Sequence, residues 1–496
     1  MVYIRFFHFR FAVNMSTTRT YESMKELLEC AKLDSSFTCN IFQSVKFDSA
    51  LSSEEYKLIE VPNSLADEII KEGGNKVITL KDEYKPNNMG RVFACTNDKT
   101  FSVIEAETSN TLLLASNWWL PSTDYPKENS VIVTTIQAMK NNYFELHQCA
   151  APSFRQLRLM LASSLYYGPV EDECESEDTI SRPAYLDLEA VQARLPCSKF
   201  ELMLAFRRLR ICEVEGYIRI LDPEYLTQVI RDLFALADEN AWDWRAHGFP
   251  VNASIEGLKN QHHPNVTKQI MALICAHLEN RKPPDSKDTY VFPRNSQICQ
   301  AVGEHLLAVI NSFDLNDFLN LWKASVPNGL KPKLRRHLTC AGRAYCEITP
   351  IPSNSSSVKS ENNDISSRFR CISLLRSEDL PDESVEARLS ALFERSPMWP
   401  ESELGSYIEE LLPPQSSGEN SSSKPFVQSY AFHDIDNADY DSDFSYEDIC
   451  AESSESLSRT EDVPKPCSPA VGSLLSKLCR VSNSSFGRIL TQRHIK

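Results

Sequence analysis

The sequence predicts an α+β protein, in which an N-terminal antiparallel β-domain precedes tandem winged-helix domains. Two patterns support this prediction. β-branched and aromatic residues cluster in short runs before Pro152, which is typical of strands. After Pro152, apolar residues recur at helical spacing, and groups of helical stretches are followed by short alternating stretches. With 496 residues, of which 42% are hydrophobic, the chain can form several domains, each with its own core.

Six runs of strand-forming residues make up the expected β-domain. A turn at residues 96–99 joins two of them as a hairpin. Six short strands form an incomplete sheet or partial barrel, whose edges expose unpaired backbone groups that a partner chain can satisfy. A closed barrel that needs no partner is the alternative, and composition favours neither. The runs span residues 56–61, 77–80, 91–95, 101–105, 112–115 and 131–136.

The first group of helices after Pro152 gives the clearest winged-helix pattern. Ser153 precedes a helix with Phe154, Leu157, Leu161 and Leu165 at helical spacing, and a second helix follows Asp187. Ser198 and Glu201 form a capping box that opens a third helix over residues 199–210. Gly216 then permits a turn into the alternating residues 217–220. Three helices followed by a hairpin is the winged-helix order.

The same order recurs along the rest of the chain, so we expect three or four winged helices. The second group has helices at 224–236, 254–259 and 266–279 before an extended stretch at 290–292. The third has helices at 298–310, 314–324 and 330–337 before 344–348 and 369–375. The last has helices at 384–394, 401–412 and 472–481 before 488–490.

These patterns set the expected domain limits. Residues 1–50 are a partly disordered N-terminal extension, and residues 51–151 form a β-barrel-like hetero-oligomerisation domain. A Ser/Asn-rich wing insert at 353–367 and an acidic, disordered insert at 414–462 interrupt the last two domains. The winged helices are expected at 152–222, 223–297, 298–380 and 381–496.

Charge is distributed unevenly. The net charge is −16, and residues 414–462 alone carry twelve acids against Lys424 and Arg459. After Asp462 the chain has no acid and six bases.

The fifteen cysteines include no C-x-x-C pair, which favours a reducing, intracellular location. The aromatic residues 1–14 carry two arginines and allow a weak alternative, a mitochondrial transit peptide; either Met1 or Met15 could be the start. No segment is long and apolar enough to span a membrane.

No catalytic or cofactor motif is present, so we expect neither an enzyme nor a cofactor. The fourteen glycines form no G-x-G-x-x-G and no P-loop. His262, His263, Cys275 and His277 lie close in sequence, but on a helix Cys275 and His277 would diverge, so we expect no metal site. The acidic run at 171–178 is expected to be a solvated loop rather than an acid–base pair.

The best candidate for DNA binding is the last unit. In a helix over 472–481, Leu474, Leu475, Leu478 and Val481 would share one face and leave the basic residues on the other. A solvated basic tail is an equally strong alternative. Binding would be independent of sequence and would include single- and double-stranded DNA. The candidate residues are Lys477, Arg480, Arg488, Arg493 and Lys496.

Two other basic clusters are weaker candidates. The helix at 199–210 is apolar on two faces, so it is expected to pack against protein on both, with Arg207, Arg208 and Arg210 at a rim. The cluster at 331–337 could face DNA, act as a nuclear-import signal or be plain helix surface. It consists of Lys331, Lys333, Arg335, Arg336 and His337.

Several ordered motifs resemble the Dcc family, named for defective sister chromatid cohesion. The likeness runs from about Leu58 to Leu412 and resumes at Val471. This sequence departs from the family pattern in its N-terminal extension and its two inserts. The motifs are VFACTNDKTF at 92–101, ETSN at 107–110, NYFEL at 142–146, YGP at 167–169, GYIRIL at 216–221, WKASVP at 322–327 and WPESEL at 399–404.

The resemblance implies a nuclear, non-catalytic subunit of an alternative replication factor C clamp loader, acting in DNA replication and sister chromatid cohesion. It implies a β-barrel shared with the chromosome transmission fidelity ATPase and its small fidelity subunit. It also implies that the winged helices reach the catalytic subunit of DNA polymerase epsilon and DNA, for loading or unloading of the sliding clamp PCNA. A winged-helix chromatin or transcription regulator, or a scaffold that never touches DNA, are the alternatives. The expected partner-binding residues are Val92, Phe93, Phe101, Val103, Leu112 and Leu114.

Overall fold

The computed structural model has two compact units. Residues 1–96 and 101–148 form the first, and residues 97–100 and 149–496 form the second. Some predictions concern residues outside the described ones: Ser153, Lys496, residues 1–19, the run at 171–178, the insert at 353–367 and the acidic insert from 414 to 462. The structure describes residues 20–32, 41–49, 51, 55–83, 90–116, 118, 129–149, 154–169, 185–277, 288–310, 312–348, 369–412, 467–484 and 487–493.

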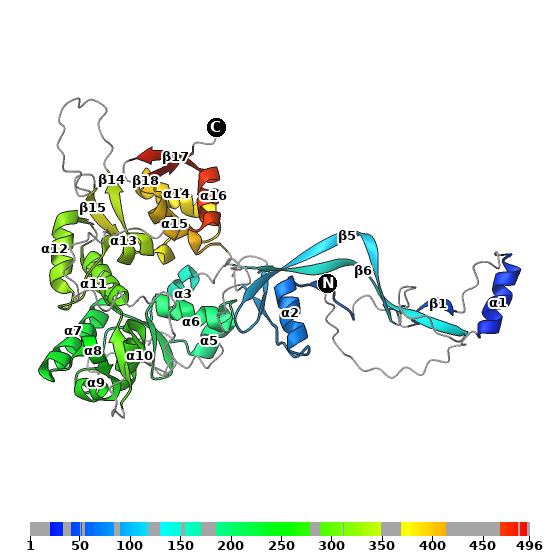
Figure 1. Ribbon diagram of the computed structural model, residues 1–496, viewed down its shortest axis with the longest axis horizontal. Helices are drawn as coiled ribbons and strands as arrows, with labels where there is room; N and C mark the ends of the chain where they lie inside the picture. Colours follow the sequence, from blue (N-terminus) through cyan, green and yellow to red (C-terminus); the bar gives the residue numbers. More distant parts are fainter. Residues whose placement is uncertain are drawn as a thin grey trace, which may run out of the picture. The chain divides into compact units, whose positions relative to one another are not determined.

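A single six-stranded sheet dominates the first unit. Its order is β1-β6-β5-β4-β3, and β2 also pairs with β6. The strands β5 and β6 form a long, curved two-stranded ribbon (Figure 1). The elements are α1 (Tyr21–Cys30), β1 (Ile41–Phe47), β2 (Ile59–Glu60), α2 (Asn63–Lys71), β3 (Thr79–Asp82), β4 (Val92–Cys95), β5 (Thr100–Ser116) and β6 (Ser130–Gln148).

The expected β-domain is therefore present, again with six strands, but their bounds differ from those expected, and β5 and β6 are much longer. The expected runs at 101–105 and 112–115 are parts of one strand, β5, which a bulge between Glu107 and Leu112 interrupts. The strand β1 lies in the range expected to be an extension, and it pairs in parallel with β6 from Ser130 to Ile136. Between the described strands the sheet does not close into a barrel, so the closed-barrel alternative is not what the chain forms by itself.

One end of this sheet has a hydrophobic core. Val61, Leu65, Ala94, Phe101 and Leu146 are buried together, and Leu65 comes from α2. Farther along the ribbon, side chains are more exposed: Leu113 in β5 and its cross-strand partner Met139 in β6 are 53% and 38% exposed. A hydrophobic core thus covers one end of the sheet, whereas apolar side chains farther along the ribbon remain exposed.

The second unit repeats one local topology four times: a helix, a short strand, two helices and a two-stranded hairpin. We call the repeats modules one to four. Module one contains α3 (Phe154–Met160), β7 (Leu165–Tyr166), α5 (Leu188–Arg194), α6 (Lys199–Arg208), β8 (Ile211–Val214) and β9 (Tyr217–Leu221). Module two contains α7 (Pro223–Glu239), α8 (Trp244–His247), β10 (Phe249–Pro250), α9 (Val251–Leu258), α10 (Pro264–Ile274), β11 (Cys275–His277) and β12 (Tyr290–Pro293).

Modules three and four complete the unit. Module three contains α11 (Asn295–Val309), β13 (Ser312–Asp314), α12 (Leu315–Ser325), α13 (Leu334–His337), η3 (Thr339–Ala341), β14 (Ala344–Ile348) and β15 (Phe369–Leu374). The short η5 (Ser377–Asp379) leads into module four. Module four contains α14 (Val385–Arg395), β16 (Met398–Pro400), α15 (Glu401–Glu409), α16 (Pro469–Leu478), β17 (Cys479–Ser484) and β18 (Gly487–Gln492).

All four sheets have the same strand order. The first strand of each module pairs with the last, and the last pairs with the middle one, as in β10-β12-β11. In module one the short β7 runs parallel to β9, whereas the first strands of the other modules are antiparallel to the last. Each module has an apolar cluster, which in module one includes Leu157, Leu202 and Phe206. The cluster of module two also includes residues of modules one and three, such as Leu221 and Ile298.

Local sequence signals set the helix starts. Ser198 and Glu201 form the expected capping box, and Asp187, Asp314 and Ser384 cap α5, α12 and α14. Positive φ angles at Glu215 and Gly216 produce the tight turn between β8 and β9.

Several helices end earlier than expected. The helix α3 ends at Met160, so Leu165 lies in β7 instead. The helices expected over 266–279 and 472–481 end at Ile274 and Leu478, and the chain continues directly into β11 and β17. The expected placement of Cys275 and His277 on a helix was therefore wrong, because both residues lie in a strand.

Candidate functional site

The first candidate surface is the outer edge of β6. On the side opposite β5, β1 pairs with β6 up to Ile136, and β2 pairs with it from Phe144. The Asp48 N–H donates to the Ile136 carbonyl, and the Phe144 N–H donates to the Leu58 carbonyl. On this side of β6 the described pairing stops at Ile136 and resumes at Phe144, and Ala138 and Lys140 between these points are buried.

Exposed apolar side chains flank this edge. Val45 and Phe47 of β1 are 47% and 60% exposed, and Leu113 and Met139 form an exposed cross-strand pair. Burying an exposed side chain of this size contributes about 1.5–3 kcal/mol. A partner segment would thus gain apolar contacts here.

The expected partner-binding residues divide into two groups. Phe101 is only 1% exposed and lies in the core beside Leu65, so it stabilises the chain's own fold. Val92 is 41% exposed, whereas Phe93, Val103, Leu112 and Leu114 are half-buried along the sheet.

Sequence reasoning missed Val45, Phe47 and Leu113. In Ile41–Phe47 the apolar Ile41, Val45 and Phe47 share one face at a spacing of two, which was a usable strand signal.

The second candidate surface is the third helix of a module. A third helix can contact DNA only where neighbouring modules leave it exposed. In module two, Gln269 of α10 is buried and clamps the edge of β8. Its Oε1 accepts from the Glu213 N–H at 2.7 Å, and its Nε2 donates to the Glu213 carbonyl at 2.8 Å. The helix α10 is therefore covered by module one and is not available to DNA along that face.

Module four covers the third-helix region of module three in the same way. The helix α13 has only four residues, and the adjacent η3 packs against α15. Thr339 of η3 donates from Oγ1 to Glu403 at 3.1 Å, and both residues are buried. His337 is buried as well, and burial, with smaller contributions from Arg336 and Lys333, lowers its pKa to about 4. This histidine is therefore neutral near pH 7 and contributes no positive charge.

The third helix of module one is fixed at its C-terminal end by ion pairs, contrary to the expected rim position of Arg208 and Arg210. Arg208 pairs with Glu410 at 2.6 Å and donates to Ser377 Oγ. Arg210 forms a two-point ion pair with Glu304, at 2.8 and 3.2 Å. The expected packing of both apolar faces was also wrong in part, since Leu204 remains 43% exposed.

These contacts belong to a larger ion network that connects modules one, three and four. Arg343, 5% exposed, lies 2.6 Å from Glu378 and 3.5 Å from Glu304 and donates to the Arg208 carbonyl. Burial alone would raise the pKa of Glu304, but the charges of Arg210, Arg343 and Arg376 outweigh it and lower that pKa to about 2. The network consists of Arg208, Arg210, Glu304, Arg343, Arg376, Glu378, Arg388 and Glu410.

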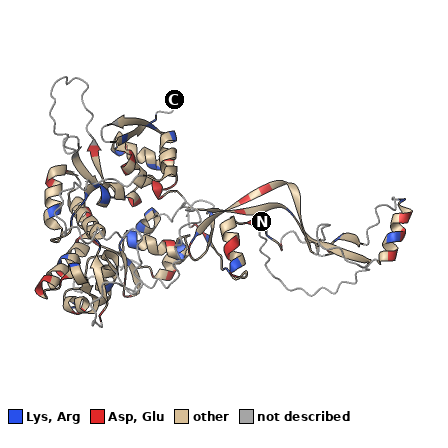
Figure 2. Ribbon diagram, in the orientation of Figure 1, with Lys and Arg blue, Asp and Glu red and all other residues tan. Residues whose placement is uncertain are grey.

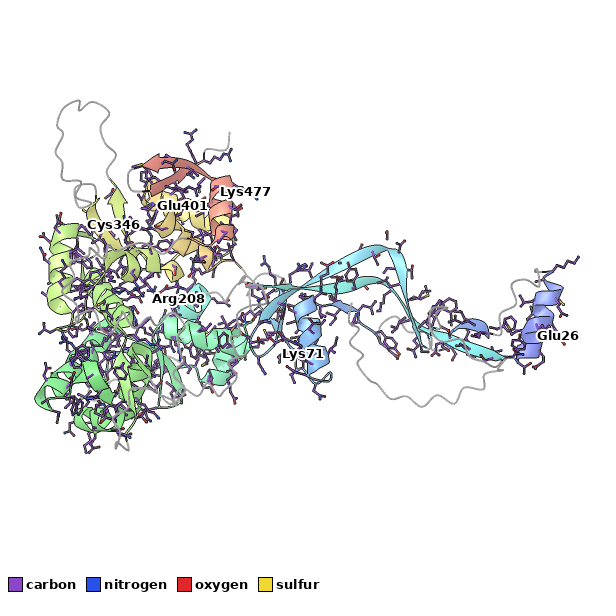
Figure 3. All side chains as sticks on the ribbon, viewed as in Figure 1. Glu26, Lys71, Arg208, Cys346, Glu401 and Lys477 are labelled. Atoms are coloured by element: carbon purple, nitrogen blue, oxygen red, sulfur yellow. The ribbon has the colours of Figure 1, made fainter. Side chains whose placement is uncertain are left out.

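The third helix of module four differs from the other three. In α16, Val471 and Leu475 are buried, while Ser473, Ser476 and Lys477 are exposed. Figure 3 labels Lys477 on this helix and Glu401 at the start of α15. In Figure 2, blue positions mark α16 and the strands beside it.

The basic side chains of module four gather although not all are helical. Arg480 lies in β17 rather than on the expected helix, and Arg488 lies in β18. Arg488 Nη2 donates to Ser476 Oγ at 3.0 Å, and Arg493 Nη1 donates to the Lys477 carbonyl at 2.9 Å. We call the exposed set Lys477, Arg480, Arg488 and Arg493 the basic surface.

The described residues offer little else that could act chemically. They contain no group of three or more His, Cys, Asp or Glu side chains placed to hold a metal ion. His262 is buried and contacts Asp232 at 2.9 Å. Burial raises the pKa of the Cys212 and Cys275 thiols to about 12, which makes them poor nucleophiles. No helix in the described ranges is long and apolar enough to cross a membrane.

Comparison with known proteins identifies relatives over most of the chain. The family model described as sister chromatid cohesion protein Dcc1 matches residues 56–408. The sister chromatid cohesion protein DCC1 of Xenopus laevis is 27% identical over 397 residues, which cover 79% of this chain and 91% of that relative. The human protein of the same name is 26% identical over 400 residues, with the same coverage. A probable relative from Dictyostelium discoideum is 20% identical over 393 residues, covering 75% and 90%.

Proposed function

The chain belongs to the sister chromatid cohesion protein Dcc1 family, and from this premise we propose that it is a non-catalytic subunit of an alternative replication factor C clamp loader. In this proposal it acts in the nucleus, in DNA replication and sister chromatid cohesion. It links the loader to the catalytic subunit of DNA polymerase epsilon and to DNA, for loading or unloading of PCNA. The resemblance of its motifs to the family supports these roles, and the relatives' names agree with a role in cohesion.

The observation that carries this proposal is the exposed apolar surface of β1 and of the β5–β6 ribbon. A sheet with a packed core at one end and exposed apolar side chains along its ribbon leaves surface that another chain can cover. We propose that the chromosome transmission fidelity ATPase and its small fidelity subunit complete this sheet into a shared barrel. The region 51–151 is the proposed hetero-oligomerisation domain, with β1 as an additional strand.

We propose that the four modules are winged helices with the limits 152–222, 223–297, 298–380 and 381–496. The repeated order of helix, strand, two helices and hairpin supports this assignment. Their contacts favour different roles. Modules one to three bury part of their third-helix regions against neighbouring modules, which favours a scaffold, whereas module four leaves α16 open.

Co-purification with the clamp-loader subunits tests the assembly role. Leu113→Glu with Met139→Glu places two charges on the exposed ribbon face, and we expect it to abolish co-purification because charges cannot be buried there unpaired. The matched control is Leu204→Glu, which changes an exposed leucine of module one and should leave this association intact. Equal retention of both variants at low salt would contradict the proposed interface.

Fluorescence anisotropy with labelled DNA tests the proposed nucleic-acid role. Lys477→Glu with Arg480→Glu should weaken binding about tenfold or more for every sequence, and should reduce the salt slope by about 2. Lys323→Glu, on the exposed side of α12, is the control. If the double variant binds like the wild type, the scaffold alternative, which never touches DNA, replaces this part of the proposal.

A further inference from the structure

The ion network at the joint of modules one, three and four carries more positive than negative charge. Its five arginines and three glutamates leave two positive charges in excess. The glutamates are shared, because three arginines contact Glu304 and two contact Glu410. The nearby Asp379 pairs with Arg158 rather than with the network. Excess charge inside a fold is unfavourable unless an ion of opposite sign accompanies it, which makes the joint suitable for an anion.

The arginines of the network lie at different depths. Arg343 is buried, whereas the side chain of Arg208, labelled in Figure 3, remains 28% exposed. Burial, which outweighs the neighbouring carboxylates, lowers the pKa of both Arg208 and Arg210. The glutamates therefore do not fully compensate these charges, and Arg208 is the place where an anion from solvent can reach the network.

Two of these arginines have donor groups to spare. Arg208 Nη2 lies 2.6 Å from Glu410 and donates to Ser377 Oγ, but its buried Nε has no acceptor among the described residues. Its guanidinium lies over the ring of Phe154, 4.8 Å from the centroid, and this contact fixes its orientation. Arg376, next to Ser377 in sequence, reaches Glu304 only through Nε, at 3.4 Å. Its two Nη groups make no polar contact with the described part of the chain.

We propose that Arg208 and Arg376 bind a small multivalent phosphate anion of the pyrophosphate class at this joint. A guanidinium presents parallel N–H donors that match the oxygens of a phosphate. The anion would use the spare donors and neutralise the excess charge, so that its binding stabilises the contact between the modules. A free anion suits the site better than the backbone of DNA, because Arg343 and Glu304 are buried and a duplex cannot enter the joint. The proposal does not depend on the proposed DNA role of the basic surface.

Isothermal titration calorimetry with pyrophosphate at low salt tests the site. The full-length protein with Lys477→Glu and Arg480→Glu is the starting point, since these changes remove phosphate binding at the basic surface. We expect one pyrophosphate per chain, and Arg376→Gln in this background should weaken its binding about tenfold or more. Arg208→Gln should do the same, and Arg376→Gln keeps the test valid should the loss of the Glu410 ion pair prevent folding.

Arg158→Gln is the matched control, because Arg158 is an exposed arginine whose partner is Asp379. It should bind pyrophosphate like the starting protein, and equal affinities of Arg158→Gln and Arg376→Gln would overturn the proposal, as would the absence of binding.

Thermal unfolding provides a second readout. Pyrophosphate at about ten times its dissociation constant should raise Tm by about 3 °C, at an ionic strength matched with chloride, and should not do so in Arg376→Gln. A short DNA duplex should not displace the bound pyrophosphate. If the duplex displaces it, and itself depends on Arg376, the ligand is a DNA phosphate and the proposal of a free anion fails.

Discussion

At the scale of single residues, burial determines which ionisable groups carry charge. His337 is 2% exposed; its Nδ1 accepts from the Lys333 N–H at 3.1 Å, and its ring lies edge-on to Trp322. The sequence placed this histidine in a basic cluster with four other residues. Burial instead makes His337 part of the core of module three. The basic cluster therefore carries one positive charge fewer than it would with a protonated histidine.

This burial predicts a pH dependence of stability. Because the folded pKa of His337 is about 4, below the usual 6.5, the unfolded chain binds the proton more readily. Its contribution is fully present above pH 6.5 and is lost as the pH falls toward 4. Between pH 7.5 and pH 5.5 we expect wild type to lose about 1.4 kcal/mol more than His337→Gln in urea unfolding.

The exposed His263 provides the control for this experiment. His263→Gln should follow the wild-type pH profile. A profile of His337→Gln that is parallel to wild type would show that His337 does not titrate as its burial requires.

At the scale of elements, the second unit is held together by side chains that pair with backbone. Gln269 substitutes for a neighbouring strand by satisfying both the N–H and the carbonyl of Glu213 in β8. This arrangement connects α10 of module two to the hairpin of module one. It also removes an exposed strand edge, which would otherwise invite pairing with another chain.

Gln269→Leu should therefore destabilise the joint between modules one and two. Two half-buried backbone groups of Glu213 would lose their partner, at a cost of up to about 1–3 kcal/mol each. Urea unfolding measures the total, and amide hydrogen exchange at Glu213 should accelerate. Gln261→Leu, at an exposed position between α9 and α10, should change neither. Unchanged exchange at Glu213 would contradict the proposed strand-edge contact.

Features that depend on residues close in sequence could be predicted, whereas features that depend on tertiary contacts could not. The capping box at Ser198 and the turn at Gly216 are local, and the structure contains both. The ends of α10 and α16 are not local: apolar residues continue through Cys275 and Cys479, and such a run suits helix or strand equally well. Pairing of those residues with β12 and β18 decides for strand, and this pairing is a tertiary contact.

The candidate sites follow the same rule. Lys477, Arg488 and Arg493 could be identified from charge alone, and the structure brings them close together. The contacts of Arg208 and Arg210 could not be predicted, because Glu304 and Glu410 are distant in sequence. The strand pattern does not distinguish the buried Phe101 from the exposed Val92, because the burial of Phe101 depends on its packing with α2.

At the scale of the whole molecule, the ion network makes modules one, three and four one cooperative body. Glu304→Gln should cost about 3–5 kcal/mol in urea unfolding, because three arginines would lose a buried partner charge. The exposed pair of Arg158 with Asp379 is the control, and Asp379→Asn should cost less than about 1 kcal/mol.

The pKa of Glu304 adds a second readout for the same variant. Because the folded pKa is lowered to about 2, its stabilisation is present above pH 4.5 and is lost as the pH falls toward 2. Glu304→Gln should therefore have a shallower acid dependence than wild type. Equal stabilities of Glu304→Gln and Asp379→Asn at pH 7 would show that the network does not hold the modules together.

The parallel pairing of β1 with β6 affects how the protein is made. Phe47 leaves the ribosome 89 residues before its partner Ile136, and at about 5–20 residues per second translation of that interval lasts about 4–18 s. During this time β1 is exposed in the nascent chain, because the strand with which it pairs has not yet been synthesised. Chaperones or a co-translationally recruited subunit have that interval in which to shield it.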